Sequence, residues 1–207
     1  MIFTQHTHPS IKLLPAVFLD RDGTINIEKK YLYKRSDWQW IEGVPNAIKQ
    51  LKDAGYRVVV VSNQAGIARG MYRAEDVKIL HEFVNAELQK IGTKIDAFYF
   101  CSHHPDFADK QPCECRKPSP NMILQAAKSL HIDLEKSWMI GDKIIDIQAG
   151  KAAKVKTILV RTGYGDQEKK LLEKRALICD DLPAAVQLIL QVRDLPINAL
   201  PHYGARE

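Results

Sequence analysis

Short apolar segments alternate with helical segments along this chain, and the alternation restricts its fold more than any other feature. The apolar segments are brief and rich in β-branched residues, as in 57–61 (RVVVV), which is typical of strands buried on both faces. Between them, segments such as 75–91 carry apolar residues at helical spacing. Because strands that alternate with helices usually pair in parallel, the sequence predicts an α/β fold with a doubly wound parallel sheet.

The same pattern predicts where the individual elements lie. The expected strands are 16–19, 57–61, 97–100, 138–140, 157–160 and 176–178. The expected helices are 45–54, 75–91, 119–131 with Ser119 as its N-cap, 144–153, 166–174 and 183–192. We expect one domain over 1–207, with its core at 15–193 and loosely held ends at 1–14 and 194–207.

Composition and charge exclude several classes of protein. Hydrophobic residues make up 45% of the chain and charged residues 27%, which excludes a disordered, collagen-like or coiled-coil protein. The formal net charge of +5 suits an anionic substrate, but the basic residues are too dispersed for a nucleic-acid binder. No apolar run reaches the roughly 18 residues of a membrane span, and the first residues do not form a secretion signal. We therefore expect a cytoplasmic protein.

Asp20 and Asp22 give the strongest chemical signal, because they directly follow the first expected strand in the run DRDGT. Two carboxylates this close repel each other unless a cation lies between them or one is protonated. Mg²⁺, bound through carboxylates and a substrate phosphate, meets that need. Asp20 could then attack phosphorus, while Asp22 gives a proton to the leaving oxygen and later activates water. The alternative is an acidic turn that merely caps the strand.

The loop after the second expected strand also suits a phosphoryl group. Ser62, Asn63 and Gln64 offer a hydroxyl and amides that can hold phosphoryl oxygens, although such a run is commonly only a turn. Arg69 lies in the flexible, glycine-flanked segment 66–70, either as a substrate contact or as a solvated cation.

Two later loops complete the set. Lys117 would balance the two aspartates and the phosphoryl group, and Arg116 could bind a second phosphate, unless both are simply exposed cations. Asp142 ends a further strand and would be an additional metal ligand. Asp146 lies one helical turn later and could orient Lys143 or a metal-bound water.

A cluster of thiols and imidazoles lies between the third expected strand and Lys117. Three thiols and one imidazole satisfy tetrahedral Zn²⁺, and a site with four protein ligands is structural rather than catalytic. The spacing alone does not decide between His103 and His104, and unliganded reduced cysteines are the alternative. The predicted ligands are Cys101, His103, Cys113 and Cys115.

Taken together, the pattern DxDGT…S…K…GDxxxD resembles the haloacid dehalogenase superfamily. Within it, the stretches FLDRDGTIN, VVVVSNQAGIARG, CSHHP, CECRKPSPNM, MIGDKIIDIQAG and VRTG resemble the D-glycero-D-manno-heptose-1,7-bisphosphate 7-phosphatase family over about 16–192. The resemblance implies a Mg²⁺-dependent phosphatase without a separate cap domain, with a loop braced by Zn²⁺. Its expected partner is a small phosphorylated sugar, with no nucleic acid or membrane, and we expect a monomer.

The resemblance also implies roles for individual residues. Asp20 would be the nucleophile and Asp22 the general acid and base, with Ser62 and Lys117 steadying the phosphoryl group. Mg²⁺ would be held by Asp20, the main chain of Asp22 and Asp142. The expected substrate contacts are Asn63, Gln64, Arg69, Arg116 and Lys143.

Two residues depart from the family pattern. Lys30 replaces a small residue in a stretch that commonly contains Gly-Tyr-Val, and Ser62 stands where Thr is frequent. Histidinol-phosphate phosphatase is the closest alternative, because it shares the loops and a similar zinc segment. A 3′-phosphatase for nucleic-acid ends lacks support, since no basic, aromatic-lined groove is visible. A non-catalytic, zinc-stabilised binding protein is the alternative of another class.

Overall fold

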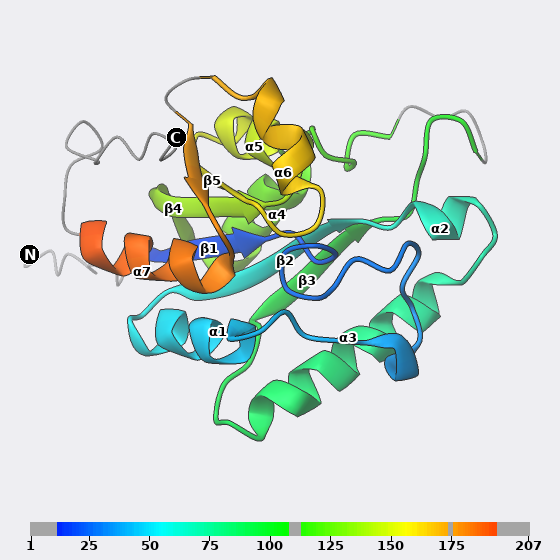
Figure 1. Cartoon of the computed structure of the whole chain (residues 1–207), viewed down its shortest axis with the longest axis horizontal. Helices are drawn as coiled ribbons and strands as arrows, with labels where there is room; N and C mark the ends of the chain where they lie inside the picture. The colour runs from blue at the N-terminus through cyan, green and yellow to red at the C-terminus, as the bar shows by residue number, and fades with distance from the viewer. Residues whose placement is uncertain (1–11, 108–112, 174–175, 194–207) are drawn as a thin grey trace, which may run out of the picture.

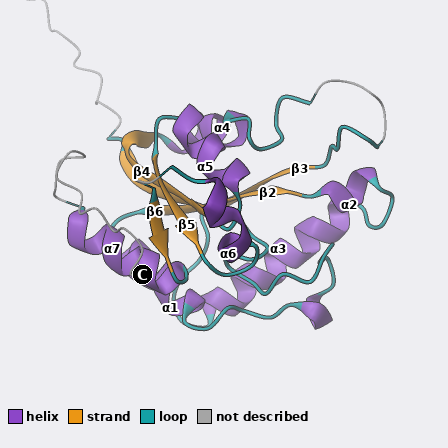
Figure 2. Cartoon of the chain, turned by 45° about the horizontal axis from the view of Figure 1, so that its top comes forward, coloured by secondary structure: helices purple, strands orange, loops and turns teal. Residues whose placement is uncertain are grey.

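The computed structural model describes residues 12–107, 113–173 and 176–193. Within them a six-stranded sheet carries helices on both faces (Figures 1 and 2). The strands are β1 (Leu14–Leu19), β2 (Arg57–Asn63), β3 (Ala97–Cys101), β4 (Ile132–Gly141), β5 (Lys156–Val160) and β6 (Leu177–Cys179). The helices are α1 (Val44–Asp53), α2 (Ala65–Ala68), α3 (Ala74–Gln89), α4 (Asn121–Leu130), α5 (Ile144–Ala152), α6 (Gly165–Glu168) and α7 (Leu182–Val192), with 3-10 segments η1 (Arg35–Asp37) and η2 (Lys169–Leu171).

The strand order is β3-β2-β1-β4-β5-β6, and every pairing is parallel. This confirms the predicted doubly wound sheet. The order reverses between β1 and β4, because β2 and β3 extend the sheet on one side and β5 and β6 on the other. In sheets of this kind, ligands bind beyond the carboxyl ends of the strands at the reversal.

Each face of the sheet has its own apolar core, because the strands are covered on both sides (Figure 1). Consecutive residues of β2 point in opposite directions and divide between the cores. Val58 packs with residues of α1, α3 and α7, whereas Val59 packs with residues of α4 and α5. The sheet is therefore a rigid platform whose carboxyl edge carries the loops.

Several elements differ from the sequence-based expectation. β4 begins at Ile132 rather than near 138. Polar residues such as Asp133 and Glu135 interrupt the apolar pattern in its first half, so the sequence did not predict a strand there. Segment 66–70, expected as a loop, overlaps the short helix α2. The expected helix 166–174 is reduced to α6 and η2.

The N-cap prediction for Ser119 was wrong. α4 begins at Asn121 with Pro120 in the N-cap position. The Ser119 hydroxyl, one residue earlier, donates to Glu114 O at 2.5 Å and accepts from Asn121 N at 3.3 Å. The expected loose ends fall largely on 1–11 and 194–207, which lie outside the described residues. Among the described helices, none combines the length and apolarity needed to cross a membrane.

Candidate active site

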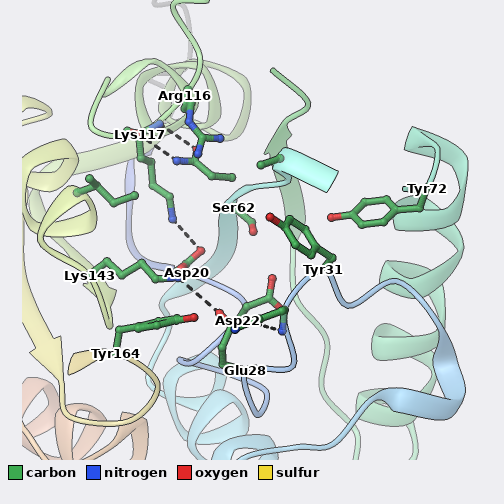
Figure 3. A pocket seen from close by; sticks show the side chains of 14 residues that line it. Asp20, Asp22, Glu28, Tyr31, Ser62, Tyr72, Arg116, Lys117, Lys143 and Tyr164 are labelled. Carbon is green, nitrogen blue, oxygen red and sulfur yellow. Dashed lines mark hydrogen bonds and ion pairs between the residues drawn. The ribbon is translucent and has the colours of Figure 1, made fainter. Parts of the chain in front are cut away.

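A cleft of about 560 Å³ opens at the carboxyl ends of β1, β2 and β4 (Figure 3). Most of the residues that line it are charged or polar, which suits a polar ligand. The lining residues are Asp20, Asp22, Glu28, Lys30, Tyr31, Ser62, Asn63, Ala65, Tyr72, Arg116, Lys117, Lys143, Ile145 and Tyr164.

Lys117 lies at the centre of a buried ion-pair network. Its Nζ is 2.7 Å from Asp20 Oδ1, 2.6 Å from Asp146 Oδ1 and 2.6 Å from Val61 O. Burial opposes the charge of Lys117, but the two carboxylates outweigh it and raise its pKa. Lys117 is therefore a fixed cation beside Asp20. The sequence-based expectation linked the Asp146 side chain to Lys143 or a water. In the structure Asp146 Oδ1 pairs with Lys117, while Oδ2 accepts from the backbone N of Lys143.

Three carboxylates, two that directly follow β1 and β4 and one in α5, converge on one point. Asp20, Asp142 and Asp146 can each place an oxygen within 4.8 Å of the others. Burial and the charge of Asp20 raise the pKa of Asp142 to about 8. Asp142 Oδ1 is buried without a hydrogen-bond partner among the described residues. A small hard cation fits this donor set, because it would both neutralise the carboxylates and satisfy that oxygen.

Two glycines make room for Asp142. Gly23 and Gly163 both have positive φ, at 83° and 59°. A Cβ at either position would overlap the Asp142 carboxylate. The glycine of DRDGT is therefore needed both for its backbone conformation and for the close approach of Asp142.

Asp22 is held in place by neighbours that sequence reasoning missed. Its carboxylate accepts from Arg21 Nη2 at 2.8 Å, from Asn26 Nδ2 at 3.0 Å and from Gln64 Nε2 at 3.2 Å. Burial raises its pKa, but the Arg21 charge and these hydrogen bonds outweigh burial, so the net shift is downward. Asp22 is consequently a carboxylate in the free protein. The buried Arg21, inside the DRDGT motif, was the signal that could have revealed this.

The residues after β2 take different positions. Ser62 lines the cleft and is 1% exposed. The Asn63 side chain forms two hydrogen bonds with the backbone of Lys117. Its Nδ2 donates to Lys117 O and its Oδ1 accepts from Lys117 N, both at 3.0 Å. Gln64 lies behind the wall at 2% exposure, where it donates to Ser62 Oγ at 2.7 Å. Gln64 is thus a support for Ser62 rather than part of the cleft lining.

The expected cations divide into two groups. Arg116 and Lys143 line the cleft. Arg116 Nη1 donates to His103 O at 3.1 Å, and Lys143 Nζ lies 4.4 Å from the Tyr164 ring and 3.5 Å from Glu28 Oε2. Asp146 reaches Lys143 only through the backbone, accepting from its N at 3.1 Å.

Arg69 is not among the lining residues. Its guanidinium lies 4.1 Å from the ring centroid of Phe107 and 5.6 Å from that of Tyr31. It therefore joins the end of α2 to two neighbouring loops by cation–π contact.

The sequence did not predict that most of the residues at 28–31, or the tyrosines described below, line the cleft. Lys30 and Tyr31 both have positive φ, at 48° and 59°, which costs L-residues energy. Figure 3 shows the Tyr31, Tyr72 and Tyr164 rings around the cleft. Tyrosines from separated segments carry no motif, so no sequence pattern could have grouped them.

The predicted zinc ligands come together at the end of β3 and in the described residues that follow it. Cys101, His103, Cys113 and Cys115 can place their ligand atoms within 4.8 Å of one another. His103 Nδ1 is 3.7 Å from Cys101 Sγ and 3.6 Å from Cys115 Sγ. His104 Nδ1 instead accepts from the backbone N of Asp106 at 3.2 Å. Three thiols and one imidazole around one point suit a soft tetrahedral ion such as Zn²⁺.

Comparison with known proteins places the chain in a family. A family model described as HAD-hydrolase-like matches residues 114–185. The D-glycero-beta-D-manno-heptose-1,7-bisphosphate 7-phosphatase of Yersinia pestis is 47% identical over 154 residues, which cover 72% of this chain and 82% of that protein. The enzyme of the same name from Escherichia coli K12 is 45% identical over 156 residues, covering 73% and 82%.

A solved structure agrees with these relatives. The D,D-heptose 1,7-bisphosphate phosphatase from B. bronchiseptica, complexed with magnesium and phosphate, superposes with a TM-score of 0.78 at 32% identity, covering 86% of this chain and 99% of that one. The comparisons do not favour the histidinol-phosphate phosphatase alternative. The chain belongs to the D-glycero-beta-D-manno-heptose-1,7-bisphosphate 7-phosphatase family of HAD-like hydrolases.

Proposed function

We propose that this protein removes the 7-phosphate of D-glycero-beta-D-manno-heptose 1,7-bisphosphate, in the synthesis of nucleotide-activated heptose for surface glycans. The observation that carries the proposal is the buried Asp20–Lys117 pair at a polar cleft, in a chain whose relatives bear that name. The beta anomer follows from the relatives at 45% and 47% identity.

Asp20 is the nucleophile. Lys117 binds its Oδ1 at 2.7 Å, so we assign the attack to Oδ2. A bond forms between Oδ2 and phosphorus while the bond from phosphorus to the sugar oxygen breaks, giving an aspartyl phosphate. Water then attacks that phosphorus and releases phosphate. Lys117 and the Ser62 hydroxyl stabilise the charge on the phosphoryl oxygens.

Asp22 moves the protons. It gives a proton to the departing sugar oxygen in the first step and takes one from the attacking water in the second. Its pKa is lowered in the free protein by Arg21 and the hydrogen bonds described above. A phosphate dianion bound beside it would raise that pKa and favour the protonated form needed for the first step.

Two metals complete the proposal. Mg²⁺ would be held by the carboxylates of Asp20 and Asp142 and the main chain of Asp22, and would supply charge neutralisation for the phosphoryl oxygens. Zn²⁺ would be held by Cys101, His103, Cys113 and Cys115 as a structural brace. Its loop leads directly into Arg116 and Lys117, so the brace would fix the direction of the chain before both cations.

Arg116 binds the phosphate that is not cleaved. Its side chain lines the cleft, and a guanidinium can form forked hydrogen bonds with phosphate. Lys30 and Lys143 line the same cleft and add positive charge to it. This collection of cations suits a doubly phosphorylated sugar better than a monophosphate.

We also propose a monomer that works in the cytoplasm. The four cysteines are free of disulfides, and the thiolate cluster needs reducing conditions to stay competent for metal binding. Light scattering during size-exclusion chromatography measures the oligomeric state directly.

A substrate panel tests the proposed function. The comparison is kcat/KM for the beta and alpha heptose 1,7-bisphosphates, the beta 1-phosphate and 7-phosphate, and histidinol phosphate, with Mg²⁺ present. We expect the beta bisphosphate to be preferred over every other compound. Preference for histidinol phosphate or for a monophosphate would overturn the proposal.

A further inference from the structure

Tyr72 lies outside every recognised motif, yet its position is tightly determined. The side chain is 6% exposed and its hydroxyl points into the cleft (Figure 3). The ring stacks on Tyr33 with centroids 5.0 Å apart, and a Cβ at Gly66 would overlap it. The absence of a side chain at Gly66 therefore leaves room for this ring. The Tyr72 hydroxyl donates to Gln64 Oε1 at 2.8 Å.

The neighbours of Gln64 fix the direction of its amide. Gln64 Nε2 lies 3.2 Å from Asp22 Oδ2 and 2.7 Å from Ser62 Oγ. A carboxylate only accepts hydrogen bonds, so the nitrogen must face Asp22. In the flipped orientation the amide oxygen would face the carboxylate and lose the Tyr72 donor. Asp22 thus selects the orientation of the amide, and in that orientation the Tyr72 hydroxyl holds the opposite end by donating to Oε1.

The orientation of the amide determines what Ser62 can do. A serine hydroxyl has one proton to donate and can also accept. Because Gln64 Nε2 donates to Ser62 Oγ, the serine proton is not used toward Gln64. Ser62 lines the cleft, so that proton remains for an acceptor inside it.

We propose that Tyr72 is a positioning residue for the hydrolysis: acting through Gln64, it directs the Ser62 hydroxyl so that its proton is donated to a phosphoryl oxygen. The inference rests on the role of Ser62 in the proposed function. A donor fixed before the substrate arrives needs no reorganisation as charge develops in the transition state. Burial raises the pKa of Tyr72 to about 12, which keeps the hydroxyl protonated as a donor.

Tyr72→Phe tests the inference, since it removes one hydroxyl and keeps the ring in its seat. We expect the single-turnover rate of phosphoryl transfer to fall about tenfold, which corresponds to one hydrogen bond, while KM changes less than about twofold. Tyr99→Phe, which removes a hydroxyl on β3 away from the cleft, is the matched control and should retain the wild-type rate. A wild-type rate in Tyr72→Phe overturns the inference.

A double-mutant cycle with Ser62→Ala separates positioning from a general loss of packing. Without the serine hydroxyl, Tyr72 has nothing left to direct. The Tyr72→Phe change should therefore cost less than about twofold in the Ser62→Ala background. A full tenfold loss in that background would show that Tyr72 acts independently of Ser62, and the inference would be wrong.

Gln64→Leu provides a second route to the same answer. It should lose as much rate as Tyr72→Phe or more. In the Ser62→Ala background the loss should shrink to the part that comes from the Gln64 hydrogen bond to Asp22. Circular dichroism melting of each variant checks that the fold persists. If Ser62→Ala alone retains the wild-type rate, the role of Ser62 in the proposed function fails as well; if only the coupling is absent, the inference alone fails.

Discussion

Two groups of residues in and beside the cleft are built in different ways. The floor is defined as the buried residues at and beneath its base (Asp20, Ser62, Lys117, Asp142 and Asp146), and the rim as the loop residues at its mouth together with Arg69 and Phe107, which adjoin Tyr31 outside the lining (Lys30, Tyr31, Arg69, Phe107 and Arg116). Every floor residue is at most 6% exposed, and ion pairs or hydrogen bonds to strand ends hold the floor together. The rim is open, with Tyr31 at 37% and Phe107 at 38% exposure, and cation–π contacts join parts of it.

The difference indicates a division of labour. A buried, charge-paired floor keeps its geometry for any phosphate ester, because breaking one partner leaves another charge uncompensated. An exposed rim of loop residues can vary in sequence without disturbing the sheet. We infer that the floor performs the reaction and the rim chooses the substrate. Changes in the floor should then affect all substrates, and changes in the rim only the bisphosphate.

Asp20→Asn should have the largest effect. An amide is a poor nucleophile, and the metal site would lose a charged ligand. Turnover of the bisphosphate and of an aryl phosphate should both fall below detection in a discontinuous phosphate assay. Asp37→Asn, in the exposed segment η1, is the matched control and should keep full activity. Substantial activity in pure Asp20→Asn protein would remove Asp20 from the mechanism.

Asp22→Asn should slow the chemistry by about 10²–10⁴-fold, which is the usual contribution of a general acid or base. The first step should suffer least with an aryl phosphate, whose leaving group needs no proton. Rapid-mixing measurement of alcohol or phenol release gives the rate of that step. Equal losses for alkyl and aryl substrates in the first step would mean that Asp22 does not protonate the leaving group.

Cys113→Ser tests whether the zinc cluster positions Arg116 in the rim and Lys117 in the floor. We expect loss of zinc and a decrease in turnover on the order of a hundredfold, because a small displacement of Arg116 and Lys117 misplaces groups that contact phosphate. The sheet should stay folded, since Cys113 is only partly buried against one of the two cores and takes no part in the other. Elemental analysis should find about one Zn²⁺ per wild-type chain. Cys179→Ser, in β6 and outside the cluster, should retain zinc and activity. A zinc-free wild-type protein with full activity would contradict the structural zinc site.

Arg116→Ala should distinguish the two phosphates. Loss of a charge-assisted contact to the uncleaved phosphate corresponds to about 1.5–3 kcal/mol, or roughly ten- to a hundredfold in kcat/KM for the bisphosphate. The 7-phosphate alone should be hydrolysed at nearly the wild-type kcat/KM. Equal losses on both compounds would place Arg116 at the reacting phosphoryl group and break the division between floor and rim.

Lys30→Gly should have the smallest effect, and it should stabilise the fold while it weakens binding of the bisphosphate. Relief of the positive φ should raise the free energy of unfolding by about 0.5–1 kcal/mol, while loss of the charge raises KM for the bisphosphate about two- to fivefold. Urea unfolding and steady-state kinetics measure the two effects. Lys29→Gly removes an adjacent charge at an ordinary φ outside the cleft and should change neither in this way. A Lys30→Gly protein that is less stable and has an unchanged KM would show that the conformation of Lys30 does not contribute to binding of the bisphosphate.

Sequence reasoning reached the floor more fully than the rim. Asp20, Ser62, Lys117 and Asp142 each lie at or near a strand end or helix start, so the alternation of elements was enough to predict that they meet. The cluster of Cys101, His103, Cys113 and Cys115 could be predicted because its members are close in sequence, and the structure brings them together. The cation–π contacts of Arg69 were not predicted, because its partners, Tyr31 and Phe107, come from distant loops. Arg21, Gln64 and Tyr72 depend on side-chain direction, which spacing does not encode.

The central claim is that Asp20 in the floor becomes covalently phosphorylated, and acid quenching tests it most directly. Asp22→Asn protein is mixed with Mg²⁺ and an aryl phosphate, which allows the first step while slowing attack by water. After acid quench and proteolysis, mass spectrometry should show one added phosphoryl group on Asp20 itself, and none when Asp20→Asn is introduced as well. Release of the phenol with no phosphoryl group on Asp20 at any quench time would contradict the account.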